Sequence, residues 1–156
     1  YVNDEAICQA AAAMLAKAGI KVDLNAQTKS KYFGKVLATG GYDTDFYLLG
    51  WTPGSFDSWN VITNLAGCRD ETGKGGPFNL GGWCSPEVDK LATEILVEND
   101  TTKRDQLIYD AYKIMTDEVS HIPLHQQSLA WGKSKKLDLT QRADNQVLFK
   151  WMTLND

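Results

Sequence analysis

Phe46-Tyr47-Leu48-Leu49-Gly50-Trp51 is a continuous apolar run, and the expected architecture follows from it. Such a run is typical of a strand buried on both faces, as in parallel sheets that helices cover. Upstream, residues 20–24 alternate apolar and polar side chains, which predicts a half-buried strand. Apolar residues recur with helical spacing in residues 6–15 and again in residues 30–39. The order helix, strand, helix, strand predicts an α/β fold with a mostly parallel sheet flanked by helices.

The rest of the chain is predicted to be a long loop followed by helices. Residues 52–82 are rich in glycine, and loops of that length in compact domains are usually functional or held closed by a cross-link. Further elements are expected as follows: a short helix at 58–65, a helix that Ser85-Pro86-Glu87 opens, a helix that Thr101 or Thr102 caps, an extended segment at 122–124 and a last strand at 147–149.

The three cysteines bear on the compartment. Cys68 and Cys84 flank the loop at residues 69–83, which has little apolar core of its own. A disulfide closing about 15 residues contributes roughly 3 kcal/mol. The sequence therefore favours a disulfide and an oxidising compartment, with two free thiols as the alternative. Cys8 lies in the apolar stripe of the first helix, where we expect a small buried core residue.

Composition narrows the class of protein. The chain has 156 residues, of which 43% are hydrophobic and 23% charged, values near the average for a soluble globular domain. The net charge of −4 removes the uniform attraction to phosphate, so we expect no nucleic-acid partner. The chain opens with Asn3-Asp4-Glu5, which resembles a helix cap, whereas a parallel-sheet domain normally opens with a strand. We therefore expect an excised fragment whose signal peptide, if it had one, is not included.

The candidate ligand site is the Gly/Pro loop that follows Trp51. Ligands of open α/β sheets collect beyond the carboxyl ends of strands, and aromatic side chains there offer large apolar areas with few rotors. The candidate ligand-binding residues are Trp51, Thr52, Pro53, Gly54, Asp57 and Trp59. The alternative is that Trp51 and Trp59 are core residues and that Asp57 caps a helix. The residues alone leave both interpretations open.

Catalytic chemistry has little support in the sequence. Nucleophile-elbow, dinucleotide and phosphate-loop motifs do not occur, so we predict no catalytic residue and no cofactor. A zinc site of Cys68, Cys84, His121 and His125 fails on geometry. Pro123 makes the histidine segment extended, so four residues span about 13 Å. Ligands of one zinc ion sit about 2 Å from it, so no metal site is predicted.

Several short motifs also occur in a characteristic order and spacing. They are Lys17-Ala18-Gly19-Ile20-Lys21-Val22, Tyr42-Asp43-Thr44-Asp45, Leu49-Gly50-Trp51, Asn79, Trp83-Cys84-Ser85-Pro86-Glu87-Val88-Asp89, Arg104 and His121-Ile122-Pro123-Leu124. Together they resemble the C-terminal part of the family 5 extracellular solute-binding proteins, the dipeptide and oligopeptide type. The resemblance runs from the first helix to about Leu124.

This resemblance implies a periplasmic-binding-protein-like lobe of a two-lobe protein. Residues 1–124 would form the second, C-terminal ligand-binding lobe, and residues 125–156 would cross back to a first lobe that this chain lacks. The loop after Gly50-Trp51 would line the ligand cleft, and cysteines placed like Cys68 and Cys84 can be bridged. The implied partners are a peptide or small-molecule ligand, the missing first lobe and the membrane subunits of an ABC importer. The implied location is periplasmic or extracellular, in bacteria.

One departure from the resemblance concerns the ligand. Similar dipeptide-binding members carry an Asp shortly after Gly-Trp-Thr that pairs with the peptide amine, whereas residues 53–55 here read Pro-Gly-Ser. Either Asp57 takes that role from a shifted position, or the ligand has no cationic amine there. Two other classes also remain as alternatives: a small secreted hydrolase or metal enzyme, and an adaptor whose aromatic loop binds a protein.

Overall fold

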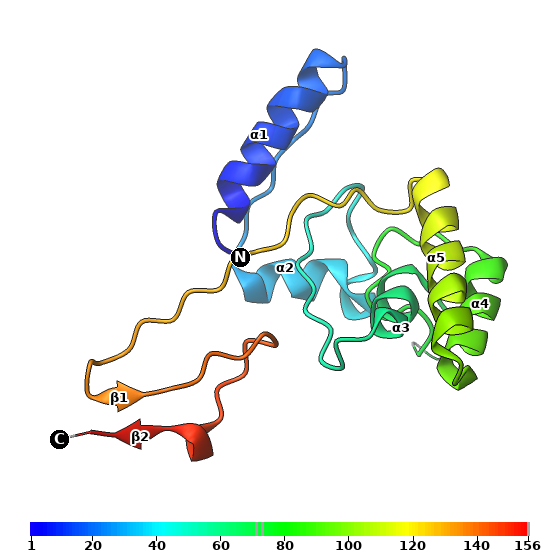
Figure 1. The fold of residues 1–156 in the computed structure, drawn as a ribbon. Helices are drawn as coiled ribbons and strands as arrows, with labels where there is room; N and C mark the ends of the chain where they lie inside the picture. The colour runs from blue at the N-terminus through cyan, green and yellow to red at the C-terminus, as the bar shows by residue number, and fades with distance from the viewer. Residues whose placement is uncertain (71, 73, 156) are drawn as a thin grey trace.

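The computed structural model describes residues 1–70, 72 and 74–155, and three of its helices gather at one end (Figure 1). The elements are α1 (Asp4–Lys17), α2 (Lys29–Val36), the 3-10 turn η1 (Ala38–Gly40), α3 (Ser58–Val61), the π-helical turn η2 (Ile62–Ala66), α4 (Pro86–Val97), α5 (Thr101–Asp117), β1 (Leu137–Asp138), the 3-10 turn η3 (Phe149–Trp151) and β2 (Thr153–Leu154). In Figure 1, α3, α4 and α5 lie together, whereas α1 and the β1–β2 hairpin project away from them. The described helices include none with the length and hydrophobicity that crossing a bilayer requires.

The hydrophobic core lies between η2, α4 and α5. Its fully or nearly buried members are Ile62, Ala66, Val88, Ala92, Ile95, Ala111 and Met115. The three α4 residues are spaced by four and three positions, so they share the helix face that meets α5. The amphipathic helices predicted for this region are confirmed. By contrast, α1 buries no residue, and Cys8, predicted to be a core residue, is only partly buried.

Local chemistry explains where the packed helices begin. Pro86 occupies the first turn of α4, where its missing N–H is harmless, and Glu87 and Asp89 complement the helix dipole. Ser85 was predicted to cap α4, but its side chain makes no capping hydrogen bond. The carboxylate of Asp100, rather than Thr101 or Thr102, caps α5 by accepting from Lys103 N at 3.0 Å.

The strands predicted at residues 20–24 and 46–51 are irregular backbone in this structure, and Phe149 begins η3 where a strand was expected. In the described part of the chain, strand pairing is limited to β1 and β2, which are antiparallel and two residues long. Phe46 is 63% exposed, so the apolar run is not buried on both faces. A strand needs a hydrogen-bonding neighbour, and neither segment is hydrogen-bonded into a sheet here. The parallel sheet of the expected α/β fold stays a prediction.

The chain exposes much more surface than a compact protein of its size. Its accessible area is 11261 Å², whereas a compact monomer of 17.3 kDa exposes about 7,800 Å². Much of the exposed apolar surface lies outside the α3–α5 core, for example at Ile20, Phe46, Ile122, Phe149 and Leu154. The segments around the core therefore leave apolar side chains in contact with water.

A covalent and hydrogen-bonded staple closes the long loop. Cys68 and Cys84 form a disulfide with their Cα atoms 4.6 Å apart, which confirms the predicted pairing. The buried Asn79 side-chain amide donates to the carbonyl oxygens of Gly67, at 2.9 Å, and of Trp83. Gly67 and Trp83 immediately precede Cys68 and Cys84, so the Asn79 side-chain amide holds both ends of the loop. Cys68 N also donates to Asp89 Oδ1 at 3.1 Å, which fixes the staple to α4.

We expect the paired substitution Cys68→Ser and Cys84→Ser to lower the free energy of unfolding by about 3 kcal/mol, because the open loop gives the unfolded chain more freedom. Urea denaturation followed by circular dichroism measures this loss. Cys8→Ser is the matched control, since Cys8 is a free thiol outside the staple. A double variant as stable as this control would contradict a stabilising role for the disulfide.

Candidate functional site

Residues 46–50 precede the candidate loop and are held in place by side chains of α2 and of the segment after α5. Tyr32 of α2 donates its hydroxyl to the carbonyl oxygen of Leu48 at 3.0 Å, and burial raises the pKa of Tyr32 to about 12. The Tyr47 hydroxyl lies 3.4 Å from His121 Nε2, and burial lowers the pKa of His121. Residues 46–50 are thus positioned by side-chain contacts rather than by a sheet.

Trp51, the first predicted site residue, is half-buried and has a fixed orientation. Its ring packs against Phe78 of the disulfide-closed loop, with 4.8 Å between the ring centroids. Its indole Nε1–H donates to Asn60 Oδ1 of α3 at 2.9 Å. Neither Phe78 nor Asn60 was predicted to belong to the site. Both lie outside the Gly/Pro segment, and only Asn60 is near Trp51 in sequence.

The tip of the loop is exposed and tightly turned. Thr52 and Gly54 are exposed and Pro53 is half-buried; the Pro53 carbonyl accepts from Phe56 N at 3.1 Å. Phe56 has a φ of 55° and is 59% exposed. A left-handed backbone at a non-glycine residue costs roughly 1–2 kcal/mol. Phe56 was missing from the predicted site residues, although an aromatic residue in a Gly/Pro loop was a usable signal.

Asp57 caps α3 and pairs with α5. Its Oδ1 accepts from Trp59 N at 2.8 Å, and its two oxygens lie 3.0 and 2.9 Å from Arg104 Nη2. Arg104 Nε donates to the Ile95 carbonyl of α4 at 3.0 Å. The hydrogen bond from Arg104 lowers the pKa of the Asp57 carboxyl, and the Trp59 N–H adds to this effect. Both oxygens of Asp57 therefore already have partners within the protein.

The six predicted residues divide by environment. Trp59 packs against the core and Asp57 caps a helix, as the alternative interpretation of the sequence expected. Thr52 and Gly54 face water, and Trp51 and Pro53 are intermediate. The ligand-binding role of the set stays a prediction.

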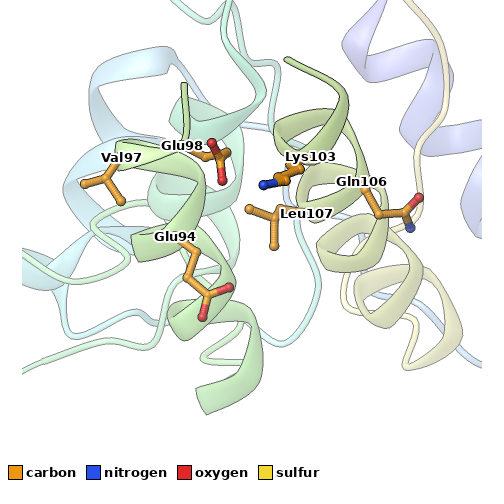
Figure 2. A pocket seen from close by; sticks show the side chains of 6 residues that line it. All are labelled: Glu94, Val97, Glu98, Lys103, Gln106 and Leu107. Carbon is orange, nitrogen blue, oxygen red and sulfur yellow. The ribbon is translucent and has the colours of Figure 1, made fainter. Parts of the chain in front are cut away.

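Two open cavities lie away from this loop. The larger one, about 500 Å³, is a groove between the end of α4 and the start of α5, where Lys103 and Leu107 point toward α4 (Figure 2). It is lined by Glu94, Val97, Glu98, Lys103, Gln106 and Leu107. The smaller one, about 390 Å³, lies among Trp131, Leu137 and neighbouring residues of the C-terminal segment. In neither cavity does a candidate loop residue form the lining.

The residues considered for zinc are not brought together. The sulfur atoms of Cys68 and Cys84 are bonded to each other, so neither is available as a thiolate ligand. His121 Nε2 faces the Tyr47 hydroxyl, and the exposed His125 contacts Gln127 Oε1 at 3.4 Å. Across residues 1–70, 72 and 74–155, no group of three or more His, Cys, Asp or Glu side chains is placed to hold a metal ion.

Comparison with curated proteins relates the chain to peptide-binding proteins. It is 28% identical over 122 residues to the dipeptide-binding protein of Pseudomonas aeruginosa PAO1, covering 78% of this chain and 22% of that protein. It is 30% identical over 109 residues to the di/tripeptide-binding protein 1 of P. aeruginosa UCBPP-PA14, covering 70% and 19%. It is 31% identical over 143 residues to the oligopeptide-binding protein OppA of Bacillus subtilis 168, covering 88% and 24%.

The chain thus spans about a fifth to a quarter of the length of these relatives, and the likeness covers most of the chain at low identity. No family model matches it, and no solved structure does. What the comparisons establish is a similarity to proteins named for binding peptides.

The Asp57–Arg104 pair gives a pH-dependent prediction. We expect Asp57→Asn to lower the free energy of unfolding by about 1–3 kcal/mol at pH 7, because it leaves Arg104 without its anionic partner. The pKa of Asp57 is lower in the folded than in the unfolded chain, so its contribution is complete above the unfolded pKa of about 3.9 and is lost as pH falls through the folded pKa.

The difference in stability between wild type and Asp57→Asn should therefore shrink as pH falls from 5 to 2. Urea denaturation at a series of pH values measures it. Asp105→Asn is the control, since Asp105 is an exposed acid next to Arg104 in sequence. A difference that stays constant across this pH range would contradict the ion pair.

Proposed function

We propose that this chain is the second lobe of a family 5 extracellular solute-binding protein, the substrate-binding component of an ABC importer. The observation that carries the proposal is the 31% identity to the oligopeptide-binding protein OppA, which extends over 88% of the chain. The order of the short motifs, from Lys17-Ala18-Gly19 to Ile122-Pro123-Leu124, supports the same family. The ligand is a peptide or a similar small solute.

In this proposal residues 1–124 form an α/β lobe, and residues 125–156 cross to a first lobe. Residues 20–24 and 46–51 become strands of a mostly parallel sheet when the remaining strands of the full protein lie beside them. The exposed Ile20, Leu24 and Phe46 support this, because each places apolar surface in water that a completed sheet and its helices would cover. The large total accessible area supports a missing partner surface as well.

Binding in the proposed protein is passive. The two lobes close over the ligand, and no bond is made or broken. The loop at residues 51–57 contributes one wall, with Trp51 held by Asn60 and Phe78. A wall on one lobe buries only part of a ligand, whereas small-molecule sites bury about 70–90% of the ligand surface.

The proposed compartment is the periplasm or the extracellular space. The Cys68–Cys84 disulfide supports it, because disulfides persist in oxidising compartments and are rare where thiols are kept reduced. The importer's membrane subunits are then the proposed protein partners.

The proposal predicts that affinity requires both lobes. Isothermal titration calorimetry with pooled di-, tri- and oligopeptides should detect saturable binding by the full-length protein. Binding by the 156-residue chain alone should be at least about 100-fold weaker, because one wall leaves most of the ligand in water. Tight binding by the chain alone would contradict the two-lobe site. Peptide or ester hydrolysis, or stoichiometric zinc, would instead favour an enzyme.

Within the full-length protein, Trp51→Ala should weaken peptide binding at least about tenfold, since the ring supplies a large contact area at little entropic cost. Tyr109→Ala is the matched control, because Tyr109 is an exposed aromatic residue on α5, outside the loop. Equal affinity of the two variants for the same peptide pool would remove Trp51 from the proposed site.

A further inference from the structure

The segment that contains the candidate loop carries almost no charge. Residues 46–67 are 22 consecutive positions with one charged side chain, Asp57. At the 23% charged residues of the whole chain, a stretch of 22 would hold about five. Within this segment, Asp57 is therefore the one charged side chain that a ligand could meet.

That carboxylate is neutralised and occupied from inside the protein. Arg104 supplies the opposite charge at 2.9 Å, and both Asp57 oxygens accept a hydrogen bond from its Nη2. The Trp59 N–H takes a further acceptor site on Oδ1. One acceptor site remains on Asp57 Oδ2, but Arg104 already balances the charge of the carboxylate, so an incoming ammonium group finds no unbalanced anionic partner there. Without such a partner, transferring the ammonium group from water costs several kcal/mol.

Arg104 is engaged through two of its three guanidinium nitrogens. Arg104 directs Nη2 to Asp57 and Nε to the Ile95 carbonyl. The pair therefore presents no excess charge of either sign to the loop. What the loop offers outward is uncharged: the exposed residues Thr52, Gly54 and Ser55, and the Phe56 ring, 59% exposed. Such a surface suits an acyl or amide group, which has apolar atoms and a neutral hydrogen-bonding carbonyl.

We infer that the ligand presents an uncharged group to this loop, and that the preferred ligand is a peptide with an acylated amine rather than a free ammonium group. The inference rests on the proposed function and narrows its substrate class. The sequence leaves two alternatives open: Asp57 pairs with the peptide amine, or the ligand has no cationic amine there. The inference selects the second, because the Asp57 carboxylate is engaged with Arg104.

Matched peptide pools test this directly. The full-length protein is titrated by calorimetry with di- and tripeptides carrying a free amine, and with the same sequences N-acetylated. We expect the acetylated pool to bind at least about tenfold more tightly, because its amide needs no counter-charge. Tighter binding of the free-amine pool would overturn the inference and leave the proposed function intact. If neither pool binds, and longer peptides do not bind either, the proposed function fails together with the inference.

A charge added at Gly54 gives an independent test. A Cβ atom built on Gly54 meets no other atom within 4 Å, and its backbone lies outside the left-handed region, so a side chain fits without strain. In the full-length protein, Gly54→Asp should tighten binding of the free-amine pool at least about tenfold, because it supplies a carboxylate that has no partner. Gly54→Asn has nearly the same shape without the charge and should leave the affinity for this pool unchanged.

Thermal unfolding and the binding of the acetylated pool show whether each Gly54 variant is folded. Equal affinities of the Asp and Asn variants for the free-amine pool, in folded protein, would overturn the inference. A second result would also overturn it: wild-type protein binds free-amine peptides, and Asp57→Asn abolishes that binding while the acetylated pool still binds. Such a result would assign the ammonium group to Asp57.

Discussion

Arg104 joins three helices with one guanidinium group. Its Nη2 holds the first turn of α3 through Asp57, and its Nε holds the last turn of α4 through the Ile95 carbonyl. Since Arg104 itself belongs to α5, the ends of all three helices are fixed relative to one another at this point. The pair is partly shielded, with the side chains of Arg104 and Asp57 26% and 33% exposed, so it is less screened than an ordinary surface ion pair. The apolar core beneath the ion pair depends on this alignment. The Ile95 carbonyl accepts the hydrogen bond from Arg104, and the Ile95 side chain is part of the core.

The disulfide and Asn79 act at the other end of the same helices. They bring the end of η2 next to the start of α4, so that Ile62 and Ala66 join Val88 and Ala92 in one hydrophobic core. Asn79 is 1% exposed, and its Oδ1 has no hydrogen-bond partner among the described residues. An unpaired buried acceptor costs about 1–3 kcal/mol. The two good bonds of its Nδ2 and the covalent closure offset that cost, which explains how a polar residue is kept in the interior.

The sequence predicted the helices and the disulfide better than the strands, because their determinants are local. Val88, Ala92 and Ile95 repeat with helical spacing, and Pro86 starts the helix within the same few residues. The alternation at residues 20–24 is equally local, but a strand also needs a neighbour that its own residues do not specify. Likewise, Arg104 and Asp57 are 47 positions apart, so no spacing rule joins them. Residue propensities assign the left-handed backbone conformation to glycine, so they do not predict it at Phe56.

The proposed ligand wall lies where the well-packed helices meet the poorly packed segments, and its geometry depends on both. Trp51 is fixed by Asn60 from the helical side, whereas residues 46–50 are held by Tyr32 and His121 from the other. The left-handed backbone of Phe56 is restrained by the Pro53 turn before it and the Asp57 cap after it. A loop restrained in this way loses little freedom when a ligand arrives, so more of the contact energy appears as affinity. Asp57 is part of that restraint. The same ion pair that makes the loop rigid therefore also makes it neutral, and rigidity and charge selectivity cannot be changed independently at this residue.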